Sequence, residues 1–344
     1  MKKIFLALIA VAVLVSCTKS EVEYAEQDKI SISPVISNMT KSMHTDTAFP
    51  DEDFNVWAFY KQVTPGTTIQ QWQEATSFDQ QEYINEKTFK KDGSLWGGAV
   101  EYYWPKLGSL MFAGYYPTDI AVHVEYVFDK TTNKMTIAGY TPGMVTTATT
   151  HVEDLMYFNM TQTSCRGGDV NVVFRHALSW VSVVLVKSAS TPDDAKIKVN
   201  YVKFTGVKPK GTGTVNNSPA PGETNEITWE TSGTPSDIVV TEDAGHVLTK
   251  GNISPLAKEP LFIPQTMDGC SLVVNYTISS KDGSEFSETK TMQLAGMKDS
   301  NDASLSKWNP AKRYTYTITI GTEEIFINPT VAGWDPVNVS LPIE

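Results

Sequence analysis

Short runs of alternating apolar and polar residues, separated by Gly, Pro, Asn and Asp, make up most of the chain. A period of two is typical of β-strands that bury one face and expose the other. From Tyr314 to Ile320, tyrosines and isoleucines occupy one face and threonines the other. Further strands are predicted at 55–60, 109–116, 170–175 and 272–278. Their number and spacing predict an all-β fold of the sandwich type.

Helical periodicity is weak beyond the first residues of the chain. Only 68–78 and 80–89 favour short helices, so we expect helices to be minor features. The polar stretch 206–234 contains several Gly and Pro residues and is predicted to be an extended hairpin or a loop. Such a segment is a suitable surface for contacts with other molecules.

The length of 344 residues allows two ordinary domains. Residues 170–186 contain no Gly or Pro, and the first polar break follows at 187–195. We therefore place the junction near residue 180, between a β-sandwich over 46–180 and a second over 181–344. Strands that run through the junction would make the pair a stiff rod.

The N-terminus has the pattern of an exported lipoprotein. Two lysines precede an apolar run from Ile4 to Val15, and Ser16 and Cys17 follow. This run has the length of a signal-peptide core and is well short of the roughly 20 residues that span a bilayer. A small residue before the cysteine resembles a lipobox, so 1–17 is predicted to be a signal peptide with palmitate-type acylation at Cys17. An ordinary secretory signal that contains a cysteine is the alternative.

The charge of the chain bears on its location and its partners. Thr18 follows Cys17, and four acidic residues occur between positions 21 and 28, which allows export to the outer membrane or the cell surface. We interpret 18–45 as a tether that includes a removable strand. The formal net charge is −11 and the few arginines are scattered, so no nucleic-acid partner is expected.

Few residues suggest catalysis or metal binding. Besides Cys17, only Cys165 and Cys270 supply thiols, and either one disulfide or two separate thiols fits the sequence. The five histidines lack the spacing of a metal site, and no nucleophile-elbow, phosphate-loop or zinc-protease motif occurs. The densest titratable cluster, 151–154, is interpreted as a solvated turn. We therefore expect no enzyme activity, no cofactor and no metal.

Seven groups of residues, taken in order, carry a family resemblance. They are Phe54–Tyr60, Tyr102–Pro105 with Leu110–Pro117, Asp154–Tyr157, Phe174–Ser179, Phe262–Gln265, Trp308–Pro310 and Val331–Asp335. In these groups the chain resembles the fimbrillin family of Bacteroidales pili over most of its mature length. The resemblance implies two transthyretin-like β-sandwich domains in tandem and the role of a fimbrial subunit that supports adhesion, with other fimbrial subunits as partners.

The same groups also predict packing residues. Trp104, Trp308 and Trp334 stand beside turn residues, where large aromatic side chains close the ends of a sandwich core. His176 follows Phe174 in a predicted strand and is interpreted as a hydrogen-bonded packing residue.

The resemblance further implies a mechanism. Such precursors reach the surface, lose an N-terminal segment to a protease, and accept a strand from a neighbouring subunit by β-augmentation. Here 30–36 has the features of the removable strand, whose apolar residues are Ile30, Ile32, Val35 and Ile36. Pro34 confines this strand to a sheet edge or a bulge.

Lys41 is the candidate processing residue. The best-known family members are cut after an arginine, but no arginine precedes Arg166 in this chain. Lys41 lies between the removable strand and the first strand of the domain. An anchor subunit that is never cut, or processing by a different enzyme, remains an alternative.

The chain ends with a candidate donor strand. Val337, Val339, Leu341 and Ile343 share one face, and the other face holds polar residues or Pro. Alternating apolar side chains at a free end suit the pockets of an open groove. The alternative is a C-terminal strand that completes its own sandwich.

Two further functional hypotheses stay open from the sequence. One is a surface lipoprotein that binds glycan or host protein without polymerising, in which Trp57, Trp72 and Trp96 stack on sugars or else pack in the core. The other is a tip or anchor subunit of the same pilus, which differs from a stalk subunit in the half of the strand exchange that it uses.

Overall fold

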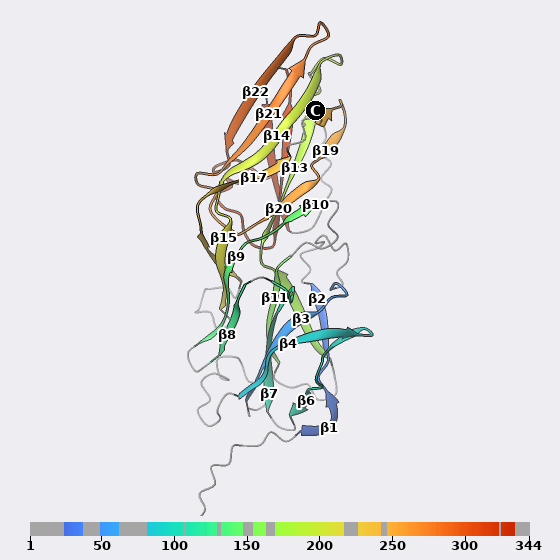
Figure 1. Ribbon diagram of the computed structural model, residues 1–344, viewed down its shortest axis with the longest axis vertical. Coiled ribbons are helices and arrows are strands. Elements are labelled where there is room, and N and C mark those ends of the chain that lie inside the picture. The colour runs from blue at the N-terminus through green and yellow to red at the C-terminus, as the bar shows by residue number, and fades with distance from the viewer. Residues whose placement is uncertain are drawn as a thin grey trace, which may run out of the picture.

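The computed structural model describes residues 24–36, 49–61, 81–105, 108–120, 122–128, 132–146, 154–162, 169–216, 226–241, 246–322 and 325–333. In this part of the chain the regular structure consists of strands β1 to β24 without a helix, so the all-β prediction is confirmed (Figure 1). No helix among these residues is long and apolar enough to cross a membrane.

A closed sheet forms the lower half of the molecule in Figure 1. Its strands, in the order in which they pair, are β11 (Met156–Gln162), β12 (Val170–His176), β2 (Ile32–Ile36), β5 (Leu95–Gly98), β4 (Gln81–Asp92), β3 (Phe54–Lys61) and β7 (Ser109–Tyr116). A two-stranded ribbon of β1 (Tyr24–Lys29) and β6 (Tyr103–Pro105) lies beside it.

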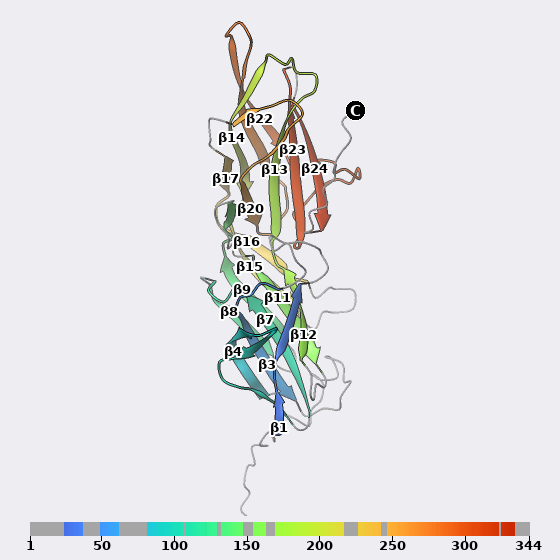
Figure 2. The same ribbon diagram turned by 90° about the vertical axis from the view of Figure 1, so that its right-hand side faces the viewer.

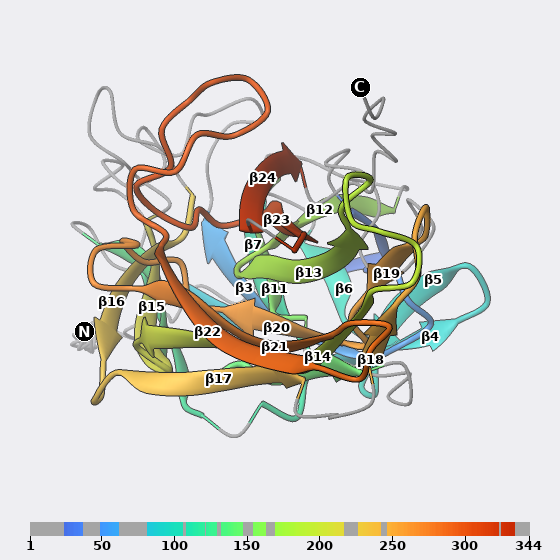
Figure 3. The ribbon, with the colours of Figure 1, turned by 90° about the horizontal axis from the view of Figure 1, so that it is seen from above.

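Two facing sheets form the upper half (Figure 2). The first contains β10 (Met144–Thr146), β20 (Lys258–Phe262), β13 (Ser179–Lys187), β23 (Lys312–Ile320) and β24 (Ile325–Gly333), with β19 (Ile253–Pro255) also paired to β13. The second contains β17 (Ser236–Thr241), β14 (Lys196–Val207), β21 (Ser271–Ser279) and β22 (Glu285–Gln293), with β18 (His246–Leu248) also paired to β14. Seen from above, they form two layers (Figure 3).

A smaller sheet lies between the lower and upper halves of the molecule. It combines two strands from the first half of the chain with two from the second half. Its order is β16 (Thr228–Ser232), β15 (Lys210–Asn216), β9 (Asn133–Tyr140) and β8 (Val124–Phe128). The predicted hairpin in 206–234 is therefore confirmed as the antiparallel pair β15 and β16.

Three buried clusters support this arrangement. One fills the closed sheet, one fills the space between the two upper sheets, and the third joins them. The third cluster brings Trp57 and Tyr157 together with Leu261 and Ile263 from the second half of the chain. Since β12 ends at His176 and β13 begins at Ser179, the chain passes from the lower sheet to the upper one beside this shared core.

One local prediction is wrong. Residues 81–89 belong to strand β4 and not to a short helix. β4 pairs with β3 on one side and with β5 on the other, and its Ile84 and Phe89 are buried. Pairing on both sides outweighs the weak local preference of this segment. The other candidate helix, 68–78, lies outside the described residues.

Candidate functional site

Strand β2 carries the segment that the sequence suggests is removable. It pairs in parallel with β12 from Ile32 opposite Val170 to Ile36 opposite Phe174. At the start of this ladder the Val170 N–H donates to the Ser31 carbonyl at 2.8 Å. On the other side, the described ladder between β2 and β5 consists of Ile32 opposite Trp96. The main-chain pairing of β2 is therefore mostly one-sided.

The position of Pro34 agrees with this one-sided pairing. Backbone groups of successive residues in a strand point alternately to its two neighbours. Since the Ser31 carbonyl accepts from β12, the backbone of Ser33 faces β12 as well, and Pro34 faces the opposite side. There a proline, which lacks an N–H, breaks no ladder bond. The prediction that Pro34 lies at a sheet edge is therefore wrong, because β2 lies between β12 and β5 in the closed sheet; the proline fits there because it faces the side on which β2 has little ladder.

Alternate residues of the segment fill the core of the closed sheet. Ile30, Ile32 and Ile36 are at most 6% exposed, and Pro34 is buried between them. Val35 is 42% exposed and faces outward. Three of the four predicted apolar residues thus point into the core. The fourth inward position belongs to Pro34, which the period of two counted from Ile30 would have identified.

An aromatic cluster lies in the same core. The Phe49 ring centre is 4.4 Å from that of Phe174, 5.3 Å from that of Phe54 and 5.8 Å from that of Trp96. Trp96 also donates its indole N–H to the Glu52 carbonyl at 2.8 Å. Phe49 therefore packs against the strands on either side of β2. Nothing in the period of the sequence distinguishes Phe49, because it lies outside any strand.

A buried polar pair lies where β11 and β12 meet. His176 Nδ1 is 2.9 Å from Asp154 Oδ2, and both side chains are almost fully buried. The prediction that His176 is a hydrogen-bonded packing residue is confirmed. The interpretation of Asp154 as part of a solvated turn is wrong, because pairing with His176 draws the carboxylate into the core.

Burial raises the pKa of the nearby Tyr116 hydroxyl, and a hydrogen bond to Glu52 raises it further.

The other predicted packing residues in the described part of the chain are buried. Trp104 and Trp308 are 2% and 1% exposed, which confirms their role in the core. Trp57 and Trp96 are also buried, so the alternative in which they stack on sugars is wrong for both. Cys270 is a free thiol whose pKa is raised by burial, and its Sγ donates to the Gly206 carbonyl.

Several predicted positions lie outside the described residues. They are Cys17, Lys41, Trp72, Cys165, Trp334 and the terminal Val337, Val339, Leu341 and Ile343. Within the part of the chain that the structure describes, no group of three or more His, Cys, Asp or Glu residues is arranged to hold a metal ion.

Comparison with known proteins identifies the family. The fimbrillin-like family model matches residues 37–334, which is most of the chain. The chain belongs to the fimbrillin-like family. This fimbrillin-like protein shares its fold with a fimbrial protein from Bacteroides vulgatus, at a TM-score of 0.59 and 16% identity, over 90% of this chain and all of that one.

Two other solved structures are similar at lower levels. A candidate cell adhesion protein from Parabacteroides distasonis has a TM-score of 0.50 at 11% identity and covers 90% of the fimbrillin-like chain and 97% of its own. The tip fimbrial protein Mfa3 from Porphyromonas gingivalis has a TM-score of 0.41 at 8% identity, over 89% and 99% of the two chains. No curated protein sequence matches the chain.

Proposed function

We propose that this chain is a structural, non-enzymatic subunit of a cell-surface fimbria and that subunits join by strand exchange at the position of β2. The observation that carries this proposal is the way in which β2 is paired and packed in the closed sheet. It is a short strand, laddered mostly on one side, whose alternating apolar residues fill the core of the closed sheet. Membership of the fimbrillin-like family supports the same role.

The C-terminal segment matches the positions that β2 fills. The inward residues Ile30, Ile32, Pro34 and Ile36 recur at every second position. Val337, Val339, Leu341 and Ile343 have the same number and the same spacing. A donor strand from a neighbouring subunit would therefore supply one apolar side chain for each one that β2 withdraws. Its main chain would also renew the ladder with β12.

Energetics favours exchange over an open groove. Burying one apolar side chain contributes about 1.5–3 kcal/mol. Withdrawal of β2 would expose several such side chains together with the aromatic residues beneath them. A subunit that has lost β2 would therefore be stabilised most by a new strand with apolar side chains at the same spacing.

A cut at Lys41 would release β2 from its domain. Lys41 lies between Ile36, the end of β2, and Phe49, where the described chain resumes. After cleavage, only noncovalent contacts would hold β2 in the closed sheet. Acylation at Cys17 would first anchor the precursor to the outer membrane, and the same cut would separate the subunit from its lipid.

Limited proteolysis tests the proposal. Mild trypsin treatment of the full chain should produce ladders of oligomers on native gels, and Lys41→Ala should block them because β2 remains attached. Lys29→Ala is the matched control, because Lys29 precedes β2 and a cut there leaves the strand joined to its domain. Oligomers that form equally well in Lys41→Ala would show that cleavage at Lys41 is not the trigger.

A further inference from the structure

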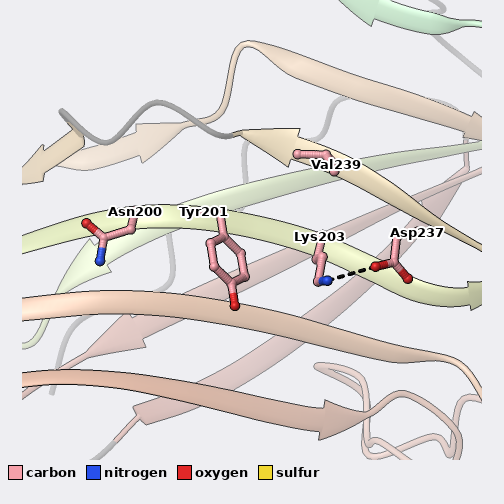
Figure 4. Close-up of a pocket in the computed structure, with 5 residues that line it drawn as sticks. All are labelled: Asn200, Tyr201, Lys203, Asp237 and Val239. Carbon is pink, nitrogen blue, oxygen red and sulfur yellow. Dashed lines mark hydrogen bonds and ion pairs between the residues drawn. The ribbon is translucent and has the colours of Figure 1, made fainter.

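An open pocket of about 310 Å³ is lined by residues of β14 and β17. Both strands belong to the upper half of the molecule and lie above β2 in Figure 1. Asn200, Tyr201 and Lys203 of β14 line it together with Asp237 and Val239 of β17 (Figure 4). This volume is at the lower end of the range for small-molecule sites, which combine apolar walls with a few placed polar groups.

The pocket lies at a β-bulge in β14. Val199 pairs with Tyr276 and Tyr201 pairs with Asn275, which leaves Asn200 as an extra residue between them. Val199 and Val202 on either side are fully buried, so Asn200 and Tyr201 both face outward. Bulges re-aim side chains in this way and are common beside functional sites.

The pocket combines an apolar surface with oriented polar groups. The Tyr201 ring and Val239 supply the apolar part, and Lys203 lies in register opposite Val239. The Asn200 amide donates to Asn275 Oδ1 at 2.7 Å and to Thr277 Oγ1 at 3.0 Å. Both of these bonds use its nitrogen and hold the Asn200 side chain against β21.

The charges in the pocket cancel each other. Lys203 Nζ donates to Asp237 Oδ2 at 2.7 Å and lies 5.7 Å from the centre of the Tyr201 ring. The second carboxylate oxygen of Asp237 stays available as an acceptor. A site with a paired cation and anion gives no preference to a charged ligand. It suits a neutral molecule with several hydroxyl groups and one apolar face.

We propose that this pocket binds a neutral sugar residue of a glycan. The C–H face of the sugar packs on Tyr201, and its hydroxyl groups donate to Asp237. Aromatic rings beside acceptor groups provide both contacts at once. The site lies on the surface of a single chain, so the proposal stands whether or not the subunits exchange strands.

Ligand-detected NMR on the full-length monomer tests this site. The probes are neutral hexoses and their disaccharides, with glucuronate as the acidic comparison. We expect dissociation constants on the order of 1 mM for a neutral sugar. Binding should weaken about 10-fold or more in Tyr201→Ala and in Asp237→Ala, a loss of about 1.4 kcal/mol. Phe326→Ala, which removes an exposed aromatic ring from β24, outside the pocket, should bind as the parent does.

Arrays of neutral mammalian-type glycans and of neutral bacterial polysaccharides distinguish the two sources of such a sugar, and binding to either supports the site. If Tyr201→Ala fails to fold, Asp237→Ala supplies the same comparison. The proposal is overturned if no neutral sugar binds to the parent protein. It is equally overturned if glucuronate binds better than every neutral hexose, or if folded variants of both residues bind like the parent.

Discussion

Ile32 of β2 lies directly opposite Trp96 of β5, and among the described residues this pair makes up the ladder between the two strands. Trp96 packs its ring against Phe49 and donates its indole N–H to the Glu52 carbonyl. On its other side β2 has a continuous parallel ladder with β12. The strand is thus held by hydrogen bonds along one edge and by apolar packing along the rest.

Ile32→Ala should destabilise the precursor. Ile32 is fully buried, and truncation of such a side chain typically costs about 2–5 kcal/mol in the free energy of unfolding. Urea unfolding of the full chain measures this loss. Val35→Ala is the matched control, since Val35 is 42% exposed and its truncation should change stability by no more than about 0.5 kcal/mol.

The same pair of variants also tests removal of the strand. Once β2 has been cleaved off and displaced by a donor strand, parent and Ile32→Ala subunits should form oligomers of equal stability. A difference that persists in purified oligomers would mean that β2 remains in place there.

Deletion of 337–344 should leave a folded monomer that does not polymerise. The deletion removes the four alternating apolar residues that we assign to the donor strand. A sharper version replaces Val339 and Leu341 with Asn, and its control replaces Asn338 and Ser340 with Ala on the opposite face. Electron microscopy follows assembly, and thermal unfolding follows the monomer. Polymers from the deleted chain would refute the donor assignment, and a monomer that fails to fold would assign these residues to its own core.

Cys17→Ala should abolish acylation and leave an uncleaved precursor, because both lipid attachment and lipobox cleavage need the cysteine sulfur. Labelling of cells with radioactive palmitate measures the lipid, and mass spectrometry measures the N-terminus. Cys165→Ala is the control and should be labelled like the parent. A normally processed, surface-located Cys17→Ala protein would rule out the lipoprotein assignment.

Stability should fall at alkaline pH partly through Tyr276. Burial, together with a 2.8 Å hydrogen bond to Glu288, raises the pKa of Tyr276 to about 12. A tyrosine in the unfolded chain has a pKa of about 10, so the unfolded state loses this proton at lower pH than the folded state does. The contribution of Tyr276 is therefore complete below about pH 10 and is lost as pH rises through about 12. Urea unfolding between these values should show a smaller decline in Tyr276→Phe, and an identical decline would contradict this role.

The local pattern of apolar and polar residues was sufficient to predict individual strands. The alternation from Tyr314 to Ile320 became β23, and the apolar run at 109–116 became β7. Side chains of successive strand residues point to opposite faces whatever the neighbouring strands are. The period of two can therefore be recognised from the sequence alone. Trp104 and Trp308 were identified for the same reason, as large apolar residues at the ends of such runs.

Contacts between distant segments decided the rest. The pairing of β2 with β12 joins Ile32 to Val170, and burial of Asp154 depends on His176 across a strand pair. The segment 81–89 became a strand because β3 and β5 flank it. Asn200 and Tyr201 share a face only because β14 contains a bulge where it pairs with β21. Each outcome depends on which strands meet, and a local pattern contains no information about that because many partners satisfy the same alternation.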